Sequence, residues 1–373
     1  MGTMKAAKMH EPNGQEVLKI ESRPIHVPLR KIGRVLLATI GYVASAQAQT
    51  VPQAPAGNAV PVTADNFNRA ETDMYFGKRV LKGGRIGNLS HSRELYLTDS
   101  PVVRPNRDTL YSGSVFDYDA GPVTVTLPDA GNRFMSMQVI DEDQYTHAVY
   151  YGAGRYTMTR EEMGTRYGSL VIRILANPQD PKDMKQVHAL QDAIKVEQKN
   201  SGKYEAPNFD PVSQKKVRDA LLVLGTTILD NKRMFGDRRE VDPVRHLIGS
   251  AMLWGGLPEK DALYLNITPD NNDGVAAYKL NVQDVPADGF WSITVYNAKG
   301  YLEPNQYNAY SVNDITAKKN TDGSVAVQFG GCDGTIPNCL PTMPGWNYMV
   351  RLYRPRAEAL NGAWKFPEAR RVN

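Results

Sequence analysis

Two separate stretches of the chain alternate between apolar and polar residues. In the first, residues 123–127 (VTVTL) and 133–140 (RFMSMQVI) alternate and are joined by a Pro/Gly-containing turn at 128–132. Residues 145–151 and 170–175 continue the pattern. A period of two is typical of half-buried β-strands, because successive side chains point to opposite faces of a sheet. The pattern predicts a β-rich module in the first half of the chain.

The same period returns in the last third of the chain. The strand candidates cover residues 277–282, 290–297 (FWSITVYN), 324–329 (SVAVQF) and 347–354 (NYMVRLYR). Turns that end in glycine separate some of them. Short strands without intervening helices are typical of a β-sandwich or a jelly roll.

Elsewhere, apolar residues recur every three or four positions, as on one face of an α-helix. A first helix is expected to begin near Thr63 or Asp65, either of which can cap it, and to end at Gly83-Gly84. A second helix is expected to begin at Pro181. The apolar stripes between the two β-rich halves are Met184, Val187, Leu190 and Ile194; Val217, Leu221, Leu224 and Ile228; and Val244, Leu247, Ile248 and Met252. We expect these stripes to be core contacts.

These patterns together predict a mainly β fold with a helical insertion (α+β), built from two β-sandwich or jelly-roll-like modules. The length of 373 residues corresponds to about two domains. The predicted parts are an extraneous or wrongly assigned extension (1–29), a signal peptide (30–48), a flexible lead-in (49–62), an N-terminal β-rich module (63–178), a helical segment (179–258) and a C-terminal jelly-roll-like module (259–373).

Residues 30–48 have the layout of a secretory signal peptide. A basic stretch at 30–34 precedes the apolar run VLLATIGYVAS at 35–45, and small residues follow at 46–48. The apolar run is shorter than the roughly 20 residues that a membrane-spanning helix needs. We therefore predict cleavage after Ala48, a periplasmic or secreted location and no stable membrane span. A buried strand or a membrane anchor is the alternative interpretation.

Upstream of this segment, residues 4–24 (MKAAKMHEPNGQEVLKIESRP) resemble the opening strands of medium-chain, zinc-type alcohol dehydrogenases and quinone reductases. No G-x-G-x-x-G loop follows, and neither cysteine stands where such an enzyme binds zinc. The extension is therefore excluded from the predicted fold.

The net charge of +4 comes entirely from the N-terminal 48 residues. They hold seven Lys or Arg and three Glu, whereas the rest of the chain has 37 basic and 37 acidic residues. A neutral body has no electrostatic preference for a polyanion, so we expect no nucleic-acid partner.

Cys332 and Cys339 flank a six-residue Gly/Pro-containing loop. In an oxidising compartment such a pair is expected to form a disulfide. A catalytic thiol or a metal pair is disfavoured because no histidine lies nearby in the sequence. The histidines of the body form no zinc-binding pattern, and His188 and His246 are expected to be structural. Because phosphate, dinucleotide and nucleophile-elbow motifs are also absent from the sequence, we predict no metal site and no cofactor.

The segment RPNRDTLYS gathers Asn106, Arg107, Asp108 and Tyr111 at the entry to a strand. The adjacent Arg and Asp can order the loop as an ion pair, or the guanidinium can bind a carboxylate ligand. We treat all four residues as ligand-binding candidates.

A second candidate group is the acidic stretch at 141–143 with Asp141, Asp143, Tyr145 and His147. It can bind calcium or supply acid–base catalysis, or it can be a solvated turn. Successive strand residues face opposite ways, so Asp141 and Asp143 are the two carboxylates that can converge.

The aromatic residues Trp291 and Tyr296 are further candidates, because aromatic rings with polar tips stack on sugars or on apolar rings. The same residues also suit the core of a sandwich.

Two sets of motifs carry a family resemblance. VVRPNRDTLYS and AGPVTVTLPDAGNRFMSMQVIDEDQY resemble a domain of unknown function, DUF twelve-fifty-four. GFWSITVYNAKGYLEPNQYNAYSVND, GGCDGTIPNCLP and VRLYRPRAEALNGAWKFP resemble its usual C-terminal companion, DUF twelve-fourteen. The resemblance covers residues 63–367 and implies an exported bacterial protein with sandwich-like modules flanking a helical segment. It implies no reaction, and Cys339 stands where many relatives have Trp.

Three functional hypotheses follow. The first is a periplasmic protein that binds a small organic or glycan ligand, or an envelope partner, through a sandwich face or an inter-domain cleft. The second is a hydrolase or lyase that uses carboxylates with Arg107. The third is a structural or assembly protein whose edge strands pair into a homo-oligomer.

Overall fold

The computed structural model describes residues 3–7, 20–24, 58–97 and 103–372. Strands β1 (Thr3–Ala7) and β2 (Ile20–Pro24) pair antiparallel with each other and belong to a unit of their own. The predicted signal peptide and its cleavage site lie outside the described residues. No helix in the described part of the chain is both long enough and apolar enough to traverse a bilayer.

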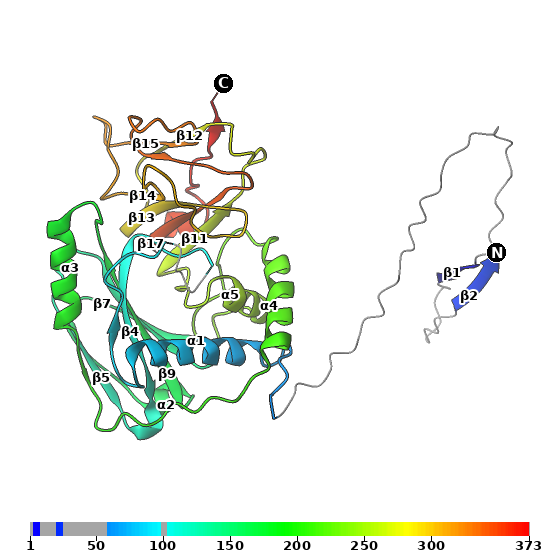
Figure 1. The fold of residues 1–373 in the computed structure, drawn as a ribbon, viewed down its shortest axis with the longest axis vertical. Helices are drawn as coiled ribbons and strands as arrows, with labels where there is room; N and C mark the ends of the chain where they lie inside the picture. The colour runs from blue at the N-terminus through cyan, green and yellow to red at the C-terminus, as the bar shows by residue number, and fades with distance from the viewer. Residues whose placement is uncertain (1–2, 8–19, 25–57, 98–102, 373) are drawn as a thin grey trace. The chain divides into compact units, whose positions relative to one another are not determined.

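The N-terminal sandwich packs a five-stranded antiparallel sheet against a three-stranded one (Figure 1). In sheet order, the larger sheet contains β3 (Ser90–His91), β4 (Thr109–Asp117), β9 (Tyr167–Leu175), β6 (Met135–Asp141) and β7 (Thr146–Tyr151). The smaller sheet contains β10 (Lys195–Glu197), β5 (Val123–Leu127) and β8 (Gly154–Met158). Strands β5, β6, β7 and β9 confirm the four strands that the sequence predicts in this half.

The alternation of side chains explains how this sandwich closes. Val123 and Val125 of β5 and Leu170 and Ile172 of β9 point into one apolar core between the sheets. Helix α3 (Pro181–Ala193) begins at the predicted proline and adds Val187 to the same core.

The C-terminal sandwich is built from two four-stranded sheets (Figure 1). In sheet order, one contains β11 (Ala262–Ile267), β17 (Asn347–Pro355), β13 (Ala287–Tyr296) and β14 (Ser311–Asn313). The other contains β16 (Cys339–Leu340), β15 (Val325–Phe329), β12 (Tyr278–Val282) and β18 (Arg370–Arg371). Strands β12, β13, β15 and β17 confirm the four predicted strands. The fold class is therefore the predicted one, mainly β with two sandwich modules.

An aromatic stack fills the core of this second sandwich. Phe329 of β15 stacks on Trp346 and on Tyr348, with ring centroids 5.3 Å and 4.8 Å apart. All three side chains are almost fully buried. Such large rings remove much apolar surface from water, which stabilises the pairing of the two sheets.

Three helices pack together beside the sheets: α1 (Phe67–Gly83), α4 (Pro211–Gly225) and α5 (Pro243–Met252). The shorter helical turns are η1 (Tyr118–Ala120), α2 (Arg160–Met163) and α6 (Ala357–Leu360). Helix α1 ends as predicted, with Gly84 in the left-handed region at φ 78°. Its expected N-cap is wrong: Asn66 precedes the first turn, and neither Thr63 nor Asp65 caps it.

A buried ion pair joins two of these helices. The guanidinium of Arg218 on α4 donates two hydrogen bonds to the carboxylate of Glu71 on α1, which is fully buried. Gln214, one turn earlier on α4, donates to the same carboxylate at 2.9 Å. Breaking such a buried pair by removing one partner is costly, so these contacts fix α4 against α1.

Part of the expected helical stripes is not in the core. Leu224 of α4 and Val244 of α5 are 51% and 64% exposed. The stripe members that are buried as predicted are Val187, Ile194, Leu221, Ile248 and Met252. Each predicted stripe spans a wider arc of its helix than the face that contacts the core, so its outermost members are exposed.

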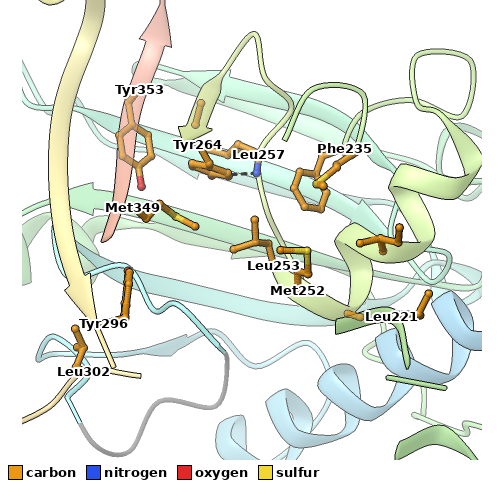
Figure 2. Packing of buried hydrophobic residues seen from close by; sticks show 14 of the residues in the cluster. Leu221, Phe235, Met252, Leu253, Leu257, Tyr264, Tyr296, Leu302, Met349 and Tyr353 are labelled. Carbon is orange, nitrogen blue, oxygen red and sulfur yellow. Dashed lines mark hydrogen bonds between the residues drawn. The ribbon is translucent and has the colours of Figure 1, made fainter. Parts of the chain in front are cut away.

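The five-stranded sheet of the N-terminal sandwich and the β11-β17-β13-β14 sheet of the C-terminal one face each other. Residues between these two sheets form a hydrophobic cluster together with the helices (Figure 2). Phe134, just before β6, packs edge-on against Phe290 of β13 and Tyr353 of β17, at 5.1 Å and 5.3 Å. Met252 and Leu253, at the end of α5, join the same cluster. The two modules are thus packed through apolar contacts in addition to the loops described below.

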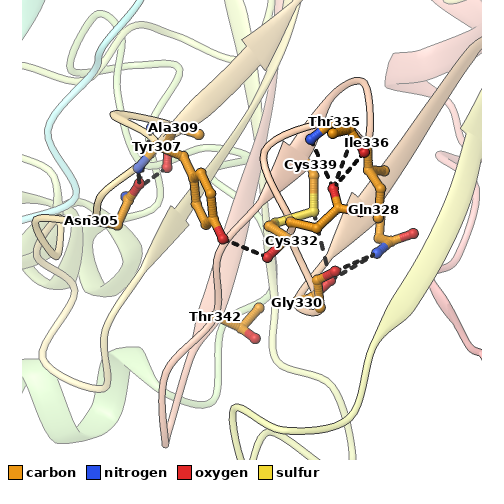
Figure 3. The surroundings of a disulfide bond; sticks show 12 residues. Asn305, Tyr307, Ala309, Gln328, Gly330, Cys332, Thr335, Ile336, Cys339 and Thr342 are labelled. Carbon is orange, nitrogen blue, oxygen red and sulfur yellow. Dashed lines mark hydrogen bonds between the residues drawn. A yellow bond between two sulfur atoms is a disulfide. The ribbon is translucent and has the colours of Figure 1, made fainter.

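The predicted disulfide between Cys332 and Cys339 is present (Figure 3). It closes the loop between β15 and β16 of the C-terminal sandwich. Tyr307 also holds this loop, because its hydroxyl donates to the carbonyl of Cys332 at 2.7 Å. The clip therefore stabilises one loop of the C-terminal sandwich and lies apart from the inter-module contacts.

Candidate functional site

A cavity of about 120 Å³ lies where the two sandwiches meet. At about 30 Å³ per water molecule in the liquid, this volume suits about four waters or a small organic molecule. Its wall is formed by the five-stranded sheet of the N-terminal sandwich and by the β11-β17-β13-β14 sheet of the C-terminal one. Helix α1, the segment before β4 and the turn that follows α5 complete it. Eight side chains that can donate hydrogen bonds line this wall: Arg79, Arg104, Arg173 and Arg351, and Tyr96, Tyr111, Tyr264 and Tyr353.

Arg173 provides a positive charge on the side of the cavity that the N-terminal sandwich forms. It sits in the middle of β9 and is only 4% exposed. Its Nη1 donates to Gln138 at 2.9 Å and its Nη2 to the carbonyl of Gly255 at 2.6 Å. Tyr111, its direct neighbour across β4, holds its ring 5.5 Å from the guanidinium. Neutral groups therefore position this charge without neutralising it.

Arg351 is the counterpart on the C-terminal wall. It lies in the middle of β17 and is 3% exposed. Its guanidinium donates to Thr294 at 3.1 Å, to the hydroxyl of Tyr296 at 2.7 Å and to the carbonyl of Arg104 at 2.9 Å. The partners are again neutral oxygen atoms.

Arg104 adds a second positive charge at this wall. Its backbone lies in the left-handed region at φ 51°, and its amide donates to the carbonyl of Gly300 at 2.8 Å. Its Nε is buried without a hydrogen-bond partner. Burial lowers the pKa of Arg104, and repulsion from Arg351 lowers it further. A non-glycine residue held in this conformation is unusual and tends to mark functional positions.

Arg79 reaches the cavity from α1. Its Nη1 lies 3.3 Å from where a Cβ would stand at Gly113 of β4, so glycine at this position leaves room for the guanidinium. The side chain of Arg79 donates no hydrogen bond to any residue that the structure describes. Burial lowers the pKa of Arg79, and repulsion from Arg173 contributes.

Two tyrosines complete the set of donors. The hydroxyl of Tyr353 accepts a hydrogen bond from Asn106 at 2.6 Å, and that of Tyr264 accepts one from the amide of Leu257 at 3.2 Å (Figure 2). Each hydroxyl therefore keeps its own proton for another acceptor. Burial raises the pKa of both tyrosines, which keeps them protonated.

The described wall of the cavity contains no aspartate or glutamate. The nearest predicted acid, Asp108, is fully buried beside it and accepts a hydrogen bond from Asn313 at 3.0 Å. Burial raises the pKa of Asp108, although Arg351 opposes this shift. The cavity is thus lined by hydrogen-bond donors and carries an excess of positive charge.

The structure brings part of the first candidate group to this cavity. Asn106 and Tyr111 line it, and Tyr296 lies directly behind Arg351. Arg107 points elsewhere: it donates to the carbonyl of Tyr96 at 2.7 Å and lies 4.5 Å from the ring of Tyr310. Arg107 and Asp108 do not form a mutual hydrogen bond among the described contacts, so the expected ordering ion pair is absent there.

The acidic candidate group lies away from the cavity. Asp141 accepts hydrogen bonds from the amides of Asp143 and Tyr145, both at 2.9 Å, and lies 2.9 Å from the Nε2 of His147. Asp143 pairs with Arg69 at 2.8 Å. The expectation of a solvated turn is wrong, because Asp141 is 5% exposed. These contacts organise the turn between β6 and β7.

Tyr145 stacks on His246 of α5 with ring centroids 4.5 Å apart. His246 itself bonds the carbonyls of Met234 and Asp143, and His188 bonds the carbonyl of Arg93, so both helical histidines have structural partners as predicted. Within the described ranges, no cluster of three or more His, Cys, Asp or Glu is arranged to hold a metal.

Trp291 belongs to the core of the C-terminal sandwich, where it is 8% exposed. Of its two suggested environments, the structure therefore places it in the core. Tyr296 is also buried, but on the opposite face of β13, toward the cavity.

The four arginines of the cavity, Arg79, Arg104, Arg173 and Arg351, were not among the site residues predicted from sequence. Two of them carry a signal that could have found them: each stands in the middle of an apolar strand, in VIRIL at 171–175 and in MVRLY at 349–353. A charged residue in the middle of an apolar strand is expected to be buried. A buried charge is costly unless it is paired or binds a ligand. Arg79 carries no comparable signal, because it lies on a helix beside other polar residues.

The fold and this cavity define a two-sandwich β-protein with a donor-lined site between its modules. The family model "Protein of unknown function (DUF1254)" matches residues 86–198, and "Protein of unknown function (DUF1214)" matches residues 261–357. The chain therefore belongs to the two-module family in which DUF1254 precedes DUF1214, as its motifs suggested. The site spans both modules, since Arg173 belongs to the first and Arg351 to the second.

The fold also occurs in solved structures. The VPA0106 protein of Vibrio parahaemolyticus matches with a TM-score of 0.62 and 19% identity, over 83% of this chain and 98% of that one. An uncharacterised protein of Burkholderia cenocepacia matches with a TM-score of 0.48 and 13% identity, over 83% and 88% of the two chains. No curated protein matches the chain significantly. At these identities the likeness to VPA0106 concerns the fold alone.

Proposed function

We propose that this chain is an exported binding protein that holds a small organic anion in the cavity between its two sandwiches. One observation carries the proposal: four guanidinium groups line the described wall of the cavity, and no carboxylate does. A buried cation without a counter-ion is unfavourable. An oxyanion ligand supplies the missing negative charge and accepts charge-assisted hydrogen bonds from arginine.

The other wall residues support an organic ligand. Val171, Leu253 and Met349 add apolar surface to the cavity, and the tyrosines add aromatic rings with free hydroxyl protons. Binding sites for small molecules combine apolar walls with a few convergent polar groups in this way. This composition favours a carboxylate on an apolar skeleton over a neutral glycan.

The alternative of a carboxylate-dependent hydrolase gains no support at this cavity. Asp108 is buried behind the wall, and Asp141 and Asp143 are engaged in the turn after β6. Paired catalytic carboxylates would need to face an open cleft.

The binding proposal is tested by thermal denaturation of the full chain with matched ligand pairs. Butyrate, benzoate and succinate are compared with their neutral amides. We expect the carboxylates to raise the melting temperature with increasing concentration, because a ligand bound only to the native state stabilises it. We expect the shift to shrink as NaCl is raised, and the amides to have no effect. Equal shifts with acids and amides, or none with any acid, would contradict the proposal.

Export rests on the signal-peptide pattern at 30–48 and on the disulfide, which persists in oxidising compartments. Mass spectrometry of the protein from its native host is expected to find an N-terminus after Ala48 and no free thiol. An intact N-terminus with two free thiols would contradict export.

A further inference from the structure

The four arginines of the cavity form two pairs on opposite walls. Arg173 lies beside Tyr111 across the β4–β9 ladder, and Gly113, two residues further along the same face, lies under Arg79. Arg79 and Arg173 are therefore neighbours on the wall of the N-terminal module.

The second pair belongs to the other wall. Arg351 of β17 donates directly to the carbonyl of Arg104, and the amide of Arg104 is tied to Gly300 of the C-terminal module. Each pair holds two like charges close together, which is unfavourable without a counter-charge. An oxyanion placed at each pair relieves that repulsion.

Apolar side chains line the same cavity as the two arginine pairs. Met349 lies on β17 two residues from Arg351, on the same face of the strand, and Val171 lies two residues from Arg173 in the same way on β9. Leu253 adds an apolar side chain from the turn after α5. A ligand in this cavity therefore contacts apolar side chains as well as the arginines.

On the basis of the proposed function, we propose that the ligand is an organic dianion with two separate oxyanion groups, one held by Arg79 and Arg173 and the other by Arg104 and Arg351. Its apolar middle contacts Met349 and Val171. The dianion therefore bridges the two modules. The cavity of about 120 Å³ is slightly smaller than the ~150 Å³ that holds one benzene ring, so the dianion is a short one of roughly six to eight non-hydrogen atoms.

The test is isothermal titration calorimetry on the full chain with dicarboxylates and their monocarboxylate counterparts. The linear acids from oxalate to suberate are compared with monocarboxylates of the same chain length, phthalate isomers with benzoate, and all with inorganic phosphate. We expect at least one dicarboxylate to bind about 10-fold or more tightly than its monocarboxylate, as a second charge-assisted contact allows. Equal affinities, or phosphate binding as tightly as the best dicarboxylate, would overturn the dianion while leaving anion binding intact. If no anion binds, the proposed function itself fails.

Two variants probe the two ends separately. Arg79→Gln and Arg104→Gln are chosen because neither side chain donates a hydrogen bond to the described residues, so both variants are expected to keep the fold. Each variant is expected to bind the best dicarboxylate no more tightly than the matched monocarboxylate. Arg155→Gln, which removes an exposed arginine paired with Glu197, is the matched control and is expected to keep the full dicarboxylate preference. If Arg79→Gln and Arg104→Gln both fold, as judged by cooperative unfolding at a melting temperature no lower than that of the wild type, and keep the preference, the two-pair assignment is wrong.

Discussion

Arg173 and Arg351 occupy equivalent places in their two sheets. Each stands in the middle of a buried strand, each is held by neutral oxygen atoms, and each faces the cavity. Hydrogen bonds to carbonyls and hydroxyls satisfy part of a guanidinium but do not neutralise its charge. At the residue scale, the candidate site is therefore a set of positioned cations whose counter-charge the described wall does not provide.

Helix α1 carries a buried acidic side chain whose pKa is strongly shifted, Asp73. Asp73 is 4% exposed, and its Oδ2 has no hydrogen-bond partner. Burial, and secondarily the charge of Glu142, raise the pKa of Asp73 to about 7. The unfolded chain releases this proton near the ordinary value of 3.8, so the native state binds more protons between these two pH values. Stability is therefore expected to fall as the pH rises from about 4 to about 7.

Asp73→Asn removes the free-energy cost of ionising a buried carboxyl group. At pH 8 the variant is expected to unfold with a free energy higher than that of the wild type by up to about 4 kcal/mol, from about three pKa units at about 1.4 kcal/mol each. At pH 4 the two proteins should differ little. Guanidinium denaturation followed by tryptophan fluorescence across this range measures both values. Asp219→Asn, at an exposed i,i+4 pair, is the control and should keep the wild-type pH dependence. A variant with an unchanged slope, or one less stable at pH 8, would show that Asp73 is ionised at no cost in the native state.

At the scale of elements, the sequence predicted strands best where one face meets a core and the other meets a polar environment. Strand β5, with alternating buried and half-buried residues, is such a case. Strand β4 was missed as a complete strand because nearly all its residues are buried: Leu110 and Phe116 face the sandwich core, while Tyr111 and Gly113 face the cavity side. Its polar residues look like surface positions in a sequence, and hydropathy alone does not distinguish a buried polar face from an exposed one.

The residues of the candidate site were likewise only partly predictable from the sequence. Asn106 and Tyr111 were found because they cluster in one short segment. The arginines come from α1, β9, β17 and the segment before β4, and only the packing of two sandwiches brings them together. Long-range contacts of this kind leave no spacing in the sequence, so the cavity could not be predicted without the fold.

At the scale of the whole molecule, the two modules share one interior. Asn106 donates to Tyr353, Tyr296 donates to the carbonyl of Pro105, and Asn313 donates to Asp108, so the segment 104–108 of the first module is anchored to the second. A ligand held by arginines from both modules adds to these contacts. The modules are therefore best understood as two walls of one site, which accounts for a cavity that neither sandwich forms alone.

The most direct test of this account is a crystal structure of the protein grown with the dicarboxylate that binds most tightly. The account predicts one ligand in the inter-module cavity, with one carboxylate within hydrogen-bond distance of Arg79 and Arg173 and the other within that distance of Arg104 and Arg351. A ligand bound elsewhere on the molecule, with the cavity holding only water at saturating concentration, would contradict the central claim.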